Sequence, residues 1–375
     1  MKILFTGGGS GGHFYPVIAL GETLNRLANE ERLIAPTLFF MAPEPYDAGL
    51  LFQNHIKYLP VSAGKMRRYF SFRNLLDIFK TILGVLKAFF VLFRILPDVV
   101  VGKGGFGSFP ALLAARLFGI PVFIHESDTV PGRVNKWAGK FAKRIAVSFA
   151  DAAQFFPKER VAYTGNPIRR ALLLRAPTAR LEELGIATDA PIIFIVGGSL
   201  GSVTLNEAIF KILPEILPSY IIVHQTGKAN LSDLVARAEV LLQTHPQKNL
   251  YHPIGYLSTE EIAAVGQGAT LIVSRAGSSL FEIAAWGKPS ILVPIGDSNG
   301  DHQRENAYAY ALSGAAEVIE ESNLTSAILK SEIEKVLGDQ SRAAKMAAAA
   351  LKFAKADAAE IIAREIIKMA LKHEE

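Results

Sequence analysis

The sequence of 375 residues contains no cysteine. This absence excludes a disulfide framework, a thiolate metal site and a cysteine nucleophile, and it fits a reducing cytoplasm. We also expect no export signal, because Met1–Thr6 lead directly into glycines without a longer apolar stretch or a small-residue cleavage site. A cytoplasmic protein is therefore predicted.

Signatures of nucleic-acid binding are also missing. There is no zinc-finger spacing, no basic helix with heptads and no aromatic RNA-binding motif, so we expect no nucleic-acid partner. Charge is nevertheless divided unevenly: residues 1–164 carry 20 Lys and Arg against 11 Asp and Glu (net +9), and residues 165–375 carry 20 against 24 (net −4). A basic first half favours an anionic partner, such as a diphosphate or an anionic lipid surface.

Short apolar runs alternate with longer helical patterns along the whole chain. This alternation predicts parallel sheets that are covered by helices on both faces. The pattern starts twice, at Ile3–Gly9 and again at Ile193–Ser199, each time as a strand, a glycine turn and a helix. We therefore predict an α/β fold of two doubly wound, Rossmann-like domains facing a cleft. The runs read as strands are Lys2–Thr6, Pro97–Val101, Pro121–Ile124, Arg144–Ser148, Ile192–Val196, Tyr220–His224, Thr270–Ser274 and Pro289–Pro294.

The domain boundary is expected near Thr164–Pro167, because Gly and Asn-Pro interrupt regular structure. This divides the chain into a first domain of residues 1–164 and a second of residues 165–344. The Ala- and Lys-rich tail reads as one closing helix, about 345–372, that packs back on the first domain.

Two glycine loops follow strands in the first domain. Gly7–His13 fits G-x-G-x-x-G before a helix, where backbone N–H groups and the helix N-terminus favour a phosphate, and His13 is a candidate general base. The alternatives are a tight turn with an ordinary capping histidine, or a dinucleotide site with Glu44 on the ribose. Gly102–Pro110 is the second loop, and its N–H groups with Lys103 form a candidate diphosphate cradle at the same sheet edge.

Further polar motifs follow other strands. In His125–Asp128, Glu126 or Asp128 is expected to orient or assist a base, and a solvated loop is the alternative. In the second domain, Gly197–Ser202 offers donors to a diphosphate, Glu282 is placed to accept from a ribose hydroxyl, and Asp301–Asn306 opens a later helix.

Residues 65–96 are both basic and strongly hydrophobic. No uncharged run here reaches the roughly 18–20 residues of a spanning helix. Lysine, arginine and aspartate recur at helical spacing on one narrow stripe, so apolar side chains cover the rest of the helix. We interpret the segment as docking on an anionic membrane interface, with burial between the sheet and a neighbouring helix as the alternative.

Taken together and in order, the motifs resemble the MurG-type glycosyltransferases of peptidoglycan synthesis over nearly the whole chain. The motifs that carry the resemblance are Gly8-Gly9-Ser10-Gly11-Gly12-His13-x-x-Pro16, Gly102-Lys103-Gly104-Gly105, His125-Glu126, Gly165-Asn166-Pro167-Ile168-Arg169, Gly197-Gly198-Ser199, Arg275-Ala276-Gly277 and Asp301-His302-Gln303-x-x-Asn306. The resemblance implies a glycosyltransferase B fold and inverting transfer without a metal or other cofactor. It implies UDP-N-acetylglucosamine as donor, undecaprenyl-diphosphate-linked N-acetylmuramyl-pentapeptide (lipid I) as acceptor, and peripheral docking on the cytoplasmic face of the cell membrane.

The resemblance also implies a role for particular residues. His13 and Glu126 are the expected catalytic residues, and Lys103, Gly104 and Gly105 are expected to meet the acceptor diphosphate. The residues expected at the donor are Ser10, Gly11, Gly12, Asp128, Arg169, Ser199, Gly277, Ser278, Glu282, Gln303 and Asn306.

The sequence departs from the family pattern at two places. Asp128 stands where the family usually has Asn, so it either repels the donor diphosphate or acts as a second base. The segment Arg275–Glu282 is one residue shorter than usual, which affects the expected donor contacts of Ser278 and Ser279.

Four other functions remain open on the residues alone. They are transfer to another lipid or metabolite acceptor, UDP-sugar epimerisation on the same fold, a nicotinamide- or flavin-dependent oxidoreductase using residues 7–12, and a binding-only protein.

Overall fold

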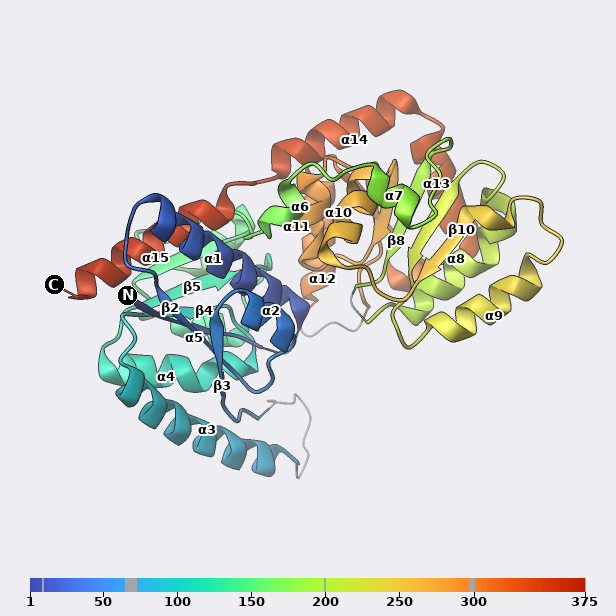
Figure 1. The fold of residues 1–375 in the computed structure, drawn as a ribbon. Helices are drawn as coiled ribbons and strands as arrows, with labels where there is room; N and C mark the ends of the chain where they lie inside the picture. The colour runs from blue at the N-terminus through green and yellow to red at the C-terminus, as the bar shows by residue number, and fades with distance from the viewer. Residues whose placement is uncertain (9, 65–72, 199, 297–300, 375) are drawn as a thin grey trace. The chain divides into compact units, whose positions relative to one another are not determined.

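The computed structural model describes residues 1–8, 10–64, 73–198, 200–296 and 301–374. The chain separates into two compact units: unit 1 comprises Met1–Arg169 and Lys355–Glu375, and unit 2 comprises Arg170–Ala354 (Figure 1). The chain therefore leaves unit 1 once, forms all of unit 2, and then returns to complete unit 1.

The expectation of one closing helix over 345–372 is wrong. The tail forms two helices, α14 (Gln340–Phe353) in unit 2 and α15 (Ala358–Glu374) in unit 1. Ala354 has an extended backbone with φ −60° and ψ 139°, which ends α14. High helix propensity on both sides of the break predicted continuity, but the chain passes between the units there, and tertiary structure outweighs propensity.

The sheet of unit 1 contains, within the described residues, seven parallel strands in the order β3-β2-β1-β4-β5-β6-β7. Ile3 and Phe5 of β1 belong to one hydrophobic core and Leu4 to the core on the opposite face. Burial on both faces explains why these strands are continuous apolar runs. The strands are β1 (Lys2–Thr6), β2 (Thr37–Ala42), β3 (Ile56–Pro60), β4 (Val99–Gly102), β5 (Val122–Glu126), β6 (Arg144–Val147) and β7 (Val161–Tyr163).

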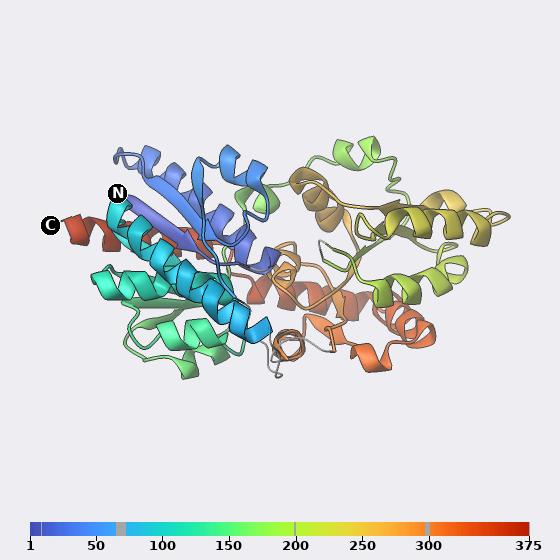
Figure 2. The same ribbon diagram turned by 90° about the horizontal axis from the view of Figure 1, so that it is seen from below.

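Helices cover both faces of this sheet (Figures 1 and 2). Helices α1 (Gly11–Glu30), α2 (Ala48–Gln53) and α15 contribute to the core on one face. Helices α3 (Arg73–Ile95), α4 (Phe109–Phe118) and α5 (Arg133–Ala138) contribute to the core on the other, together with the 3-10 helix η2 (Ala150–Phe155). A further 3-10 turn, η1 (Phe106–Ser108), precedes α4.

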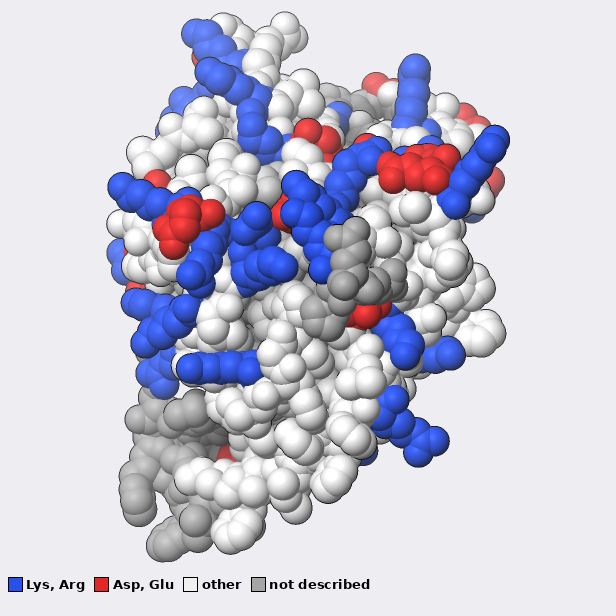
Figure 3. Space-filling model, turned by 90° about the vertical axis from the view of Figure 1, so that its left-hand side faces the viewer, with Lys and Arg blue, Asp and Glu red and all other residues white. Residues whose placement is uncertain are grey.

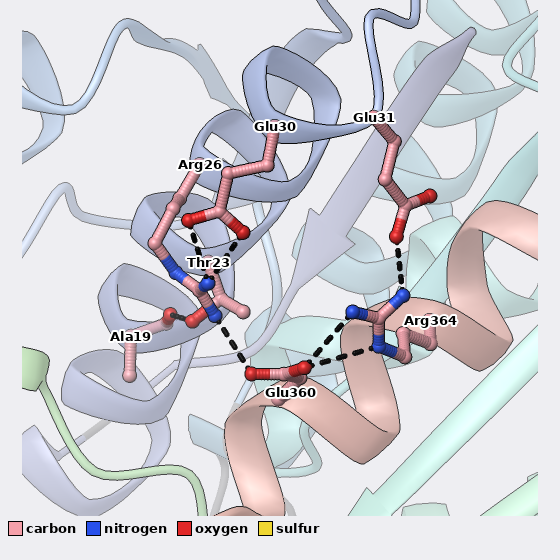
Figure 4. Close-up of polar contacts among 7 residues, drawn as sticks. All are labelled: Ala19, Thr23, Arg26, Glu30, Glu31, Glu360 and Arg364. Carbon is pink, nitrogen blue, oxygen red and sulfur yellow. Dashed lines mark hydrogen bonds and ion pairs between the residues drawn. The ribbon is translucent and has the colours of Figure 1, made fainter.

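Helix α15 packs along α1 although the two are far apart in sequence. Its buried side chains, including Ile362 and Ile366, join the core that contains α1. At the rim, Arg26 binds Glu30 and Glu360, with Nη2 of Arg26 2.9 Å from Oε2 of Glu360, and Arg364 binds Glu360 and Glu31 (Figure 4). Because these ionic groups are partly exposed, burial of the apolar face is expected to stabilise the contact more than the ion pairs do.

Helix α3 packs chiefly along α4, where Phe89 and Phe93 stack on Phe118, and it buries only a narrow stripe of its own surface. Among residues 77–95 only Gly84, Ala88 and Leu92 are buried. A Cβ on Gly84 would lie 1.7 Å from the carbonyl oxygen of Ser62, so only glycine permits this close packing. Large apolar side chains between 36% and 69% exposed cover much of the rest: Ile78, Phe79, Ile82, Leu83, Leu86, Phe89, Phe90 and Phe93. The predicted surplus of apolar surface is therefore confirmed for this helix, whereas Lys65–Phe70 lie outside the described residues.

The sheet of unit 2 repeats the topology of unit 1. Within the described residues it has six parallel strands in the order β10-β9-β8-β11-β12-β13, with α/β layers on both faces. The strands are β8 (Ile192–Val196), β9 (Ile221–Gln225), β10 (Tyr251–Ile254), β11 (Leu271–Ser274), β12 (Ser290–Leu292) and β13 (Ala316–Val318). The helices are α6 (Arg170–Leu173), α7 (Ala179–Glu183), α8 (Val203–Ile216), α9 (Leu231–Leu241), α10 (Thr259–Gly268), α11 (Ser279–Ala285), α12 (His302–Ala311), α13 (Ser326–Leu337) and α14, with 3-10 turns η3 (Lys248–Leu250) and η4 (Glu321–Asn323).

Candidate functional site

The glycine loops of unit 1 lie side by side at the point where the strand order reverses. Strands β1 and β4 are paired there, with Thr6 opposite Gly102, so the loops that follow them are neighbours. Gly105 has φ +78°, and a Cβ on it would lie 2.4 Å from the carbonyl oxygen of Gly8. The prediction that both loops share one sheet edge is confirmed, and this edge is where open α/β sheets bind ligands.

His13 lies in the first turn of α1, directly after the first loop. Its Nδ1 is 3.1 Å from Oγ of Ser10, and a Cβ on Gly105 would lie 3.4 Å from its Cε1. The imidazole therefore faces the meeting point of the two loops. If Nδ1 donates its hydrogen to Ser10, Nε2 carries a lone pair that can accept a proton.

The motif His125–Asp128 differs from the expected loop. Strand β5 continues to Glu126, and His125, Glu126 and Ser127 are all buried, so a solvated loop is wrong for these three residues. The Glu126 carboxylate accepts hydrogen bonds from the backbone N–H of Asp128 at 3.0 Å, from that of Gly132 at 3.0 Å and from Nδ2 of Asn135 at 2.9 Å. The Glu126 carboxylate is tolerated at the end of the strand because both of its oxygens accept hydrogen bonds.

Burial and the neighbouring Asp128 raise the pKa of Glu126. The three donors around this carboxylate fix the turn that leads from β5 towards α5. Glu126 thus has a clear framework role, and its expected catalytic role stays a prediction.

Lys103 follows β4 but does not project from its loop. Its side chain is 1% exposed, and Nζ donates to Oγ of Ser127, which in turn donates to Oδ1 of Asn166 at 3.1 Å. Burial lowers the pKa of Lys103 to about 8. The Lys103 ammonium therefore lies beneath its loop and binds Ser127, and contact with a diphosphate stays a prediction for Lys103, Gly104 and Gly105.

His125 connects the same cluster to the end of unit 1. Its Nε2 lies 3.1 Å from the carbonyl oxygen of Gly165 and must donate to it, because a carbonyl only accepts. Burial and the charge of Lys103 lower the pKa of His125 well below its ordinary value, so the ring is neutral. Arg169 is also buried, with its guanidinium 4.4 Å from the ring centre of Tyr15 on α1.

Unit 2 carries glycine loops at its own switch point, after the paired strands β8 and β11. Gly198 and Gly201 have positive φ, and Ser202 caps α8 by accepting from the N–H of Leu205 at 3.3 Å. Ser199 lies outside the described residues. After β11, a Cβ on Gly277 would meet no described residue within 4 Å, so this part of the backbone has room for a ligand beside it.

The remaining expected donor residues lie on the helices that follow. Ser278 precedes α11, and Glu282 is in the first turn of that helix. Oε1 of Gln303 accepts from the N–H of Ile295 at 3.2 Å. Asn306 is 2% exposed and its Nδ2 donates to the carbonyl oxygen of Ala276 at 3.3 Å, so it supports the loop after β11 from below.

A buried network that the sequence did not indicate lies beneath the first loop of unit 2. His224 Nε2 is 3.0 Å from Oδ1 of Asn206, and its Nδ1 is 3.1 Å from the hydroxyl of Tyr251. Nδ2 of Asn206 donates to the carbonyl oxygen of Thr226 at 3.0 Å, and that oxygen would be 1.9 Å from a Cβ on Gly201. The network therefore supports the turn at Gly201.

Metal ligands do not gather in the part of the chain that the structure describes: no group of three or more His, Cys, Asp or Glu residues there could hold an ion.

Comparison with known proteins identifies the family. Residues 3–147 match the glycosyltransferase family 28 N-terminal domain, and residues 192–362 match the family 28 C-terminal domain. The chain belongs to glycosyltransferase family 28. The two matches cover both switch points described above, so each unit contributes a family 28 domain.

Curated relatives narrow the comparison within family 28 to one kind of enzyme. It is 37% identical over 331 residues to a Treponema denticola protein (84% of this chain, 83% of the relative) and 35% identical over 338 residues to one from Clostridium kluyveri (89% and 91%). Both are named UDP-N-acetylglucosamine--N-acetylmuramyl-(pentapeptide) pyrophosphoryl-undecaprenol N-acetylglucosamine transferase. The resemblance to MurG-type transferases is confirmed.

Solved structures agree. The crystal structure of Acinetobacter baumannii MurG matches with a TM-score of 0.73 at 26% identity, covering 98% of this chain and 99% of that one. A UDP-GlcNAc 2-epimerase from Neisseria meningitidis, bound to UDP-GlcNAc, matches with a TM-score of 0.69 at 17% identity, covering 98% of this chain and 100% of that one. Because its identity is only 17%, the epimerase match shows a shared fold and nothing further. Together with the two parallel sheets, the MurG match confirms the predicted α/β fold of two Rossmann-like domains.

Proposed function

We propose that this chain transfers N-acetylglucosamine from UDP-N-acetylglucosamine to the C4 hydroxyl of N-acetylmuramyl-pentapeptide-diphosphoryl-undecaprenol (lipid I), giving lipid II for peptidoglycan. The observation that carries the proposal is the shared name of relatives that are 35–37% identical over most of this chain. The glycine loops at both switch points support it, because the reaction joins two substrates that each carry a diphosphate.

The reaction requires a base for the acceptor. The C4 oxygen forms a bond to C1 of the donor sugar while the bond from C1 to the β-phosphate oxygen breaks, and UDP leaves with that electron pair. Attack opposite the leaving group inverts C1, and the hydroxyl proton passes to the base. We assign the base to His13, since a hydrogen bond from Nδ1 to Ser10 leaves Nε2 able to accept it.

The leaving diphosphate requires donors, and unit 2 is assigned to the donor. In this assignment Ser199, Gly277 and Ser278 bind the diphosphate, and Glu282 binds the ribose. Gln303 and Asn306 of unit 2 complete the donor set, together with five residues of unit 1: Ser10, Gly11, Gly12, Asp128 and Arg169. Preorganised N–H groups at such positions stabilise the charge that develops on the leaving group.

The acceptor is assigned to unit 1. Gly104 and Gly105 offer backbone N–H groups to its diphosphate, with the charge of Lys103 beneath. A pocket of about 290 Å³ continues from this edge towards α3. Pro43 forms one wall of the pocket and would lie 2.6 Å from a Cβ on Gly107, while Lys80 and Lys87 of α3 line the other side. We assign this pocket, with its two lysines, to an anionic lipid headgroup.

We further propose that α3 docks on the cytoplasmic face of the membrane. Among the helices that the structure describes, none combines the length and the apolar character needed to cross a membrane. The exposed apolar side chains of α3 are accompanied by the exposed basic residues Lys80, Lys87 and Arg94. Figure 3 shows many Lys and Arg side chains, with fewer Asp and Glu among them, above a largely uncharged area, and α3 runs along the lower edge of unit 1 in Figure 1. Such a surface suits an anionic interface.

Vesicle co-sedimentation tests this docking. The double variant Phe79→Ser, Phe90→Ser should lose binding to anionic vesicles, whereas the control Val240→Ser, which changes an exposed apolar residue of unit 2, should keep it. Equal recovery of all three proteins with neutral and anionic vesicles would contradict the assignment.

The transfer itself is tested with radiolabelled UDP-N-acetylglucosamine and a synthetic lipid I analogue, with UDP-glucose and UDP-galactose in parallel. Product from the N-acetylglucosamine donor alone supports the proposed donor, acceptor and reaction. No product from a protein that binds UDP would refute the acceptor.

His13→Ala should abolish turnover and leave UDP affinity nearly unchanged, with the exposed His55→Ala as control. A large loss of UDP affinity in His13→Ala would refute the assignment of the base.

A further inference from the structure

Arg275, the residue directly after β11, is buried although it is charged. Only 7% of the residue is exposed, and its guanidinium binds three segments that are distant in sequence. Nη1 donates to the carbonyl oxygen of Val293 at 3.0 Å, and Nη2 donates to Oγ of Ser202 at 2.5 Å and to the carboxylate of Glu321. A planar guanidinium with five N–H groups can join three acceptors in this way, and a lysine ammonium at the same position cannot reproduce the geometry.

Two of these contacts, with Ser202 and Val293, end in loops at or next to the switch point of unit 2. Ser202 closes the glycine loop after β8, and a Cβ on Gly197 would lie 2.6 Å from its backbone nitrogen. Val293 follows β12 and leads to Ile295, whose N–H binds Gln303. Arg275 itself opens the loop after β11 that contains Gly277. One side chain thus joins the loops after β8, β11 and β12.

Glu321 completes the connection from η4. Its Oε1 accepts from Arg275, and its Oε2 accepts from the N–H of Gly296 at 3.0 Å. It therefore neutralises the buried guanidinium and ties down the loop after β12 with its second oxygen. A buried ion pair that costs desolvation is a weak source of stability, so its retention beside a candidate ligand site points to a different benefit.

That benefit is preorganisation. When a loop becomes ordered only on binding, the free energy needed to order it lowers the affinity for the ligand. A loop that is already held in place does not carry this cost. N–H groups serve a diphosphate best when their directions are set before it arrives. Through one guanidinium, the described parts of the three loops, at Ser202, Arg275 and Val293, keep their positions relative to one another.

We propose that Arg275 and Glu321 are positioning residues for a nucleoside diphosphate donor: they hold the three loops of unit 2 in their binding geometry without touching the donor. The inference rests on the proposed function, in which unit 2 binds UDP-N-acetylglucosamine. It goes further by assigning donor affinity to a pair of residues beneath the site.

Titration calorimetry with UDP tests the proposal in Glu321→Ala, Ser202→Ala and Arg275→Lys. The expected result is a rise in the UDP dissociation constant of roughly ten- to a hundredfold for Glu321→Ala and Arg275→Lys, which is the effect of losing hydrogen bonds to a charged group. Glu321→Gln keeps one acceptor oxygen and should fall between Glu321→Ala and the unaltered protein. In transfer assays the KM for the donor should rise with UDP affinity, while the KM for the acceptor changes less than about twofold.

The matched control is Glu207→Gln. Glu207 forms a two-point ion pair with Arg237, at 2.6 and 2.8 Å, between α8 and α9 of the same unit. This control should bind UDP as the unaltered protein does. Thermal unfolding without UDP identifies variants that fail to fold. If Glu321→Ala or Arg275→Lys fails to fold, Ser202→Ala still tests the proposal, because it removes one contact of Arg275 and leaves the ion pair between Arg275 and Glu321 in place.

The outcomes separate the two proposals. Folded Glu321→Ala and Ser202→Ala proteins that bind UDP with unaltered affinity would overturn the positioning role, while transfer by the unaltered protein would still support the proposed function. An unaltered protein that binds no UDP would overturn both. Equal rises in the KM of donor and acceptor would indicate a general structural defect and would also count against positioning.

Discussion

His224 provides a test of the buried chemistry of unit 2 through acid unfolding. Asn206 presents Oδ1 to this ring, because its Nδ2 donates to Thr226. Nε2 of His224 must therefore carry the hydrogen, and Nδ1 accepts from the hydroxyl of Tyr251. Protonation at Nδ1 would break that bond and bury a cation, and burial accordingly lowers the pKa of His224 to about 3.

The magnitude follows from this pKa. The unfolded chain binds a proton at His224 below its ordinary pKa of 6.5, whereas the folded chain does not until about pH 3. Full stability is thus present above pH 6.5 and is lost as the pH falls towards 3. Since one pKa unit is worth about 1.4 kcal/mol, the total loss is roughly 5 kcal/mol, of which roughly 2 kcal/mol has gone at pH 5.

The assay uses the two tryptophans of the chain, one in each unit. In a Trp137→Phe background, urea unfolding followed by Trp286 fluorescence reports unit 2. His224→Gln retains a donor and an acceptor but cannot be protonated in this range. We expect the unaltered histidine to lose roughly 2 kcal/mol more than the variant between pH 7 and pH 5. Parallel losses in both proteins would refute the reasoning, and the exposed His55→Gln should lose as much as the unaltered protein.

Three further predictions concern unit 1 and are measured by urea unfolding or by transfer rate. Because the pKa of Lys103 falls from 10.5 to about 8, its buried charge destabilises the fold below pH 8; stability should rise by roughly 2 kcal/mol from pH 8 to pH 10, and Lys103→Met should lack this rise. Gly105→Ala should reduce the transfer rate at least about tenfold, because the new Cβ is strained at positive φ and collides with the carbonyl oxygen of Gly8. Gly119→Ala, at φ +69° with no described residue within 4 Å, should leave the rate unchanged, and equal rates in the two variants would contradict the loop contact. Glu360→Gln should cost under about 1 kcal/mol and Ile366→Ala about 2–5 kcal/mol, and the reverse order would show that the ion pairs hold α15.

The regular part of the fold could be predicted from the sequence because its signals are local. Central strands such as β1 and β8 are continuous apolar runs followed by glycines, and both were predicted with their observed bounds. Edge strands were not predicted. Strand β10 contains Pro253, which an edge tolerates because one side of the strand needs no partner, and β7 has only three residues.

The candidate site could be predicted only in part, because its polar contacts join distant residues. Glycine loops and His13 follow strands in a recognisable order. The burial of Lys103 depends on Ser127 and Asn166, and the partner of Arg275 is 46 positions away at Glu321. Nothing in a local window indicates such pairs, since a charged residue after a strand reads equally well as exposed.

The return of the chain to unit 1 has a consequence for biosynthesis. The core of unit 1 is incomplete without Ile362 and Ile366 of α15, which emerge from the ribosome only after all of unit 2. At roughly 5–20 residues per second, the first 169 residues wait roughly 10–40 s for their last helix. During that interval α15 is not yet available to cover the apolar face of α1, whereas unit 2 can already fold. Nascent chains stalled before α15 should therefore be the form most dependent on chaperones.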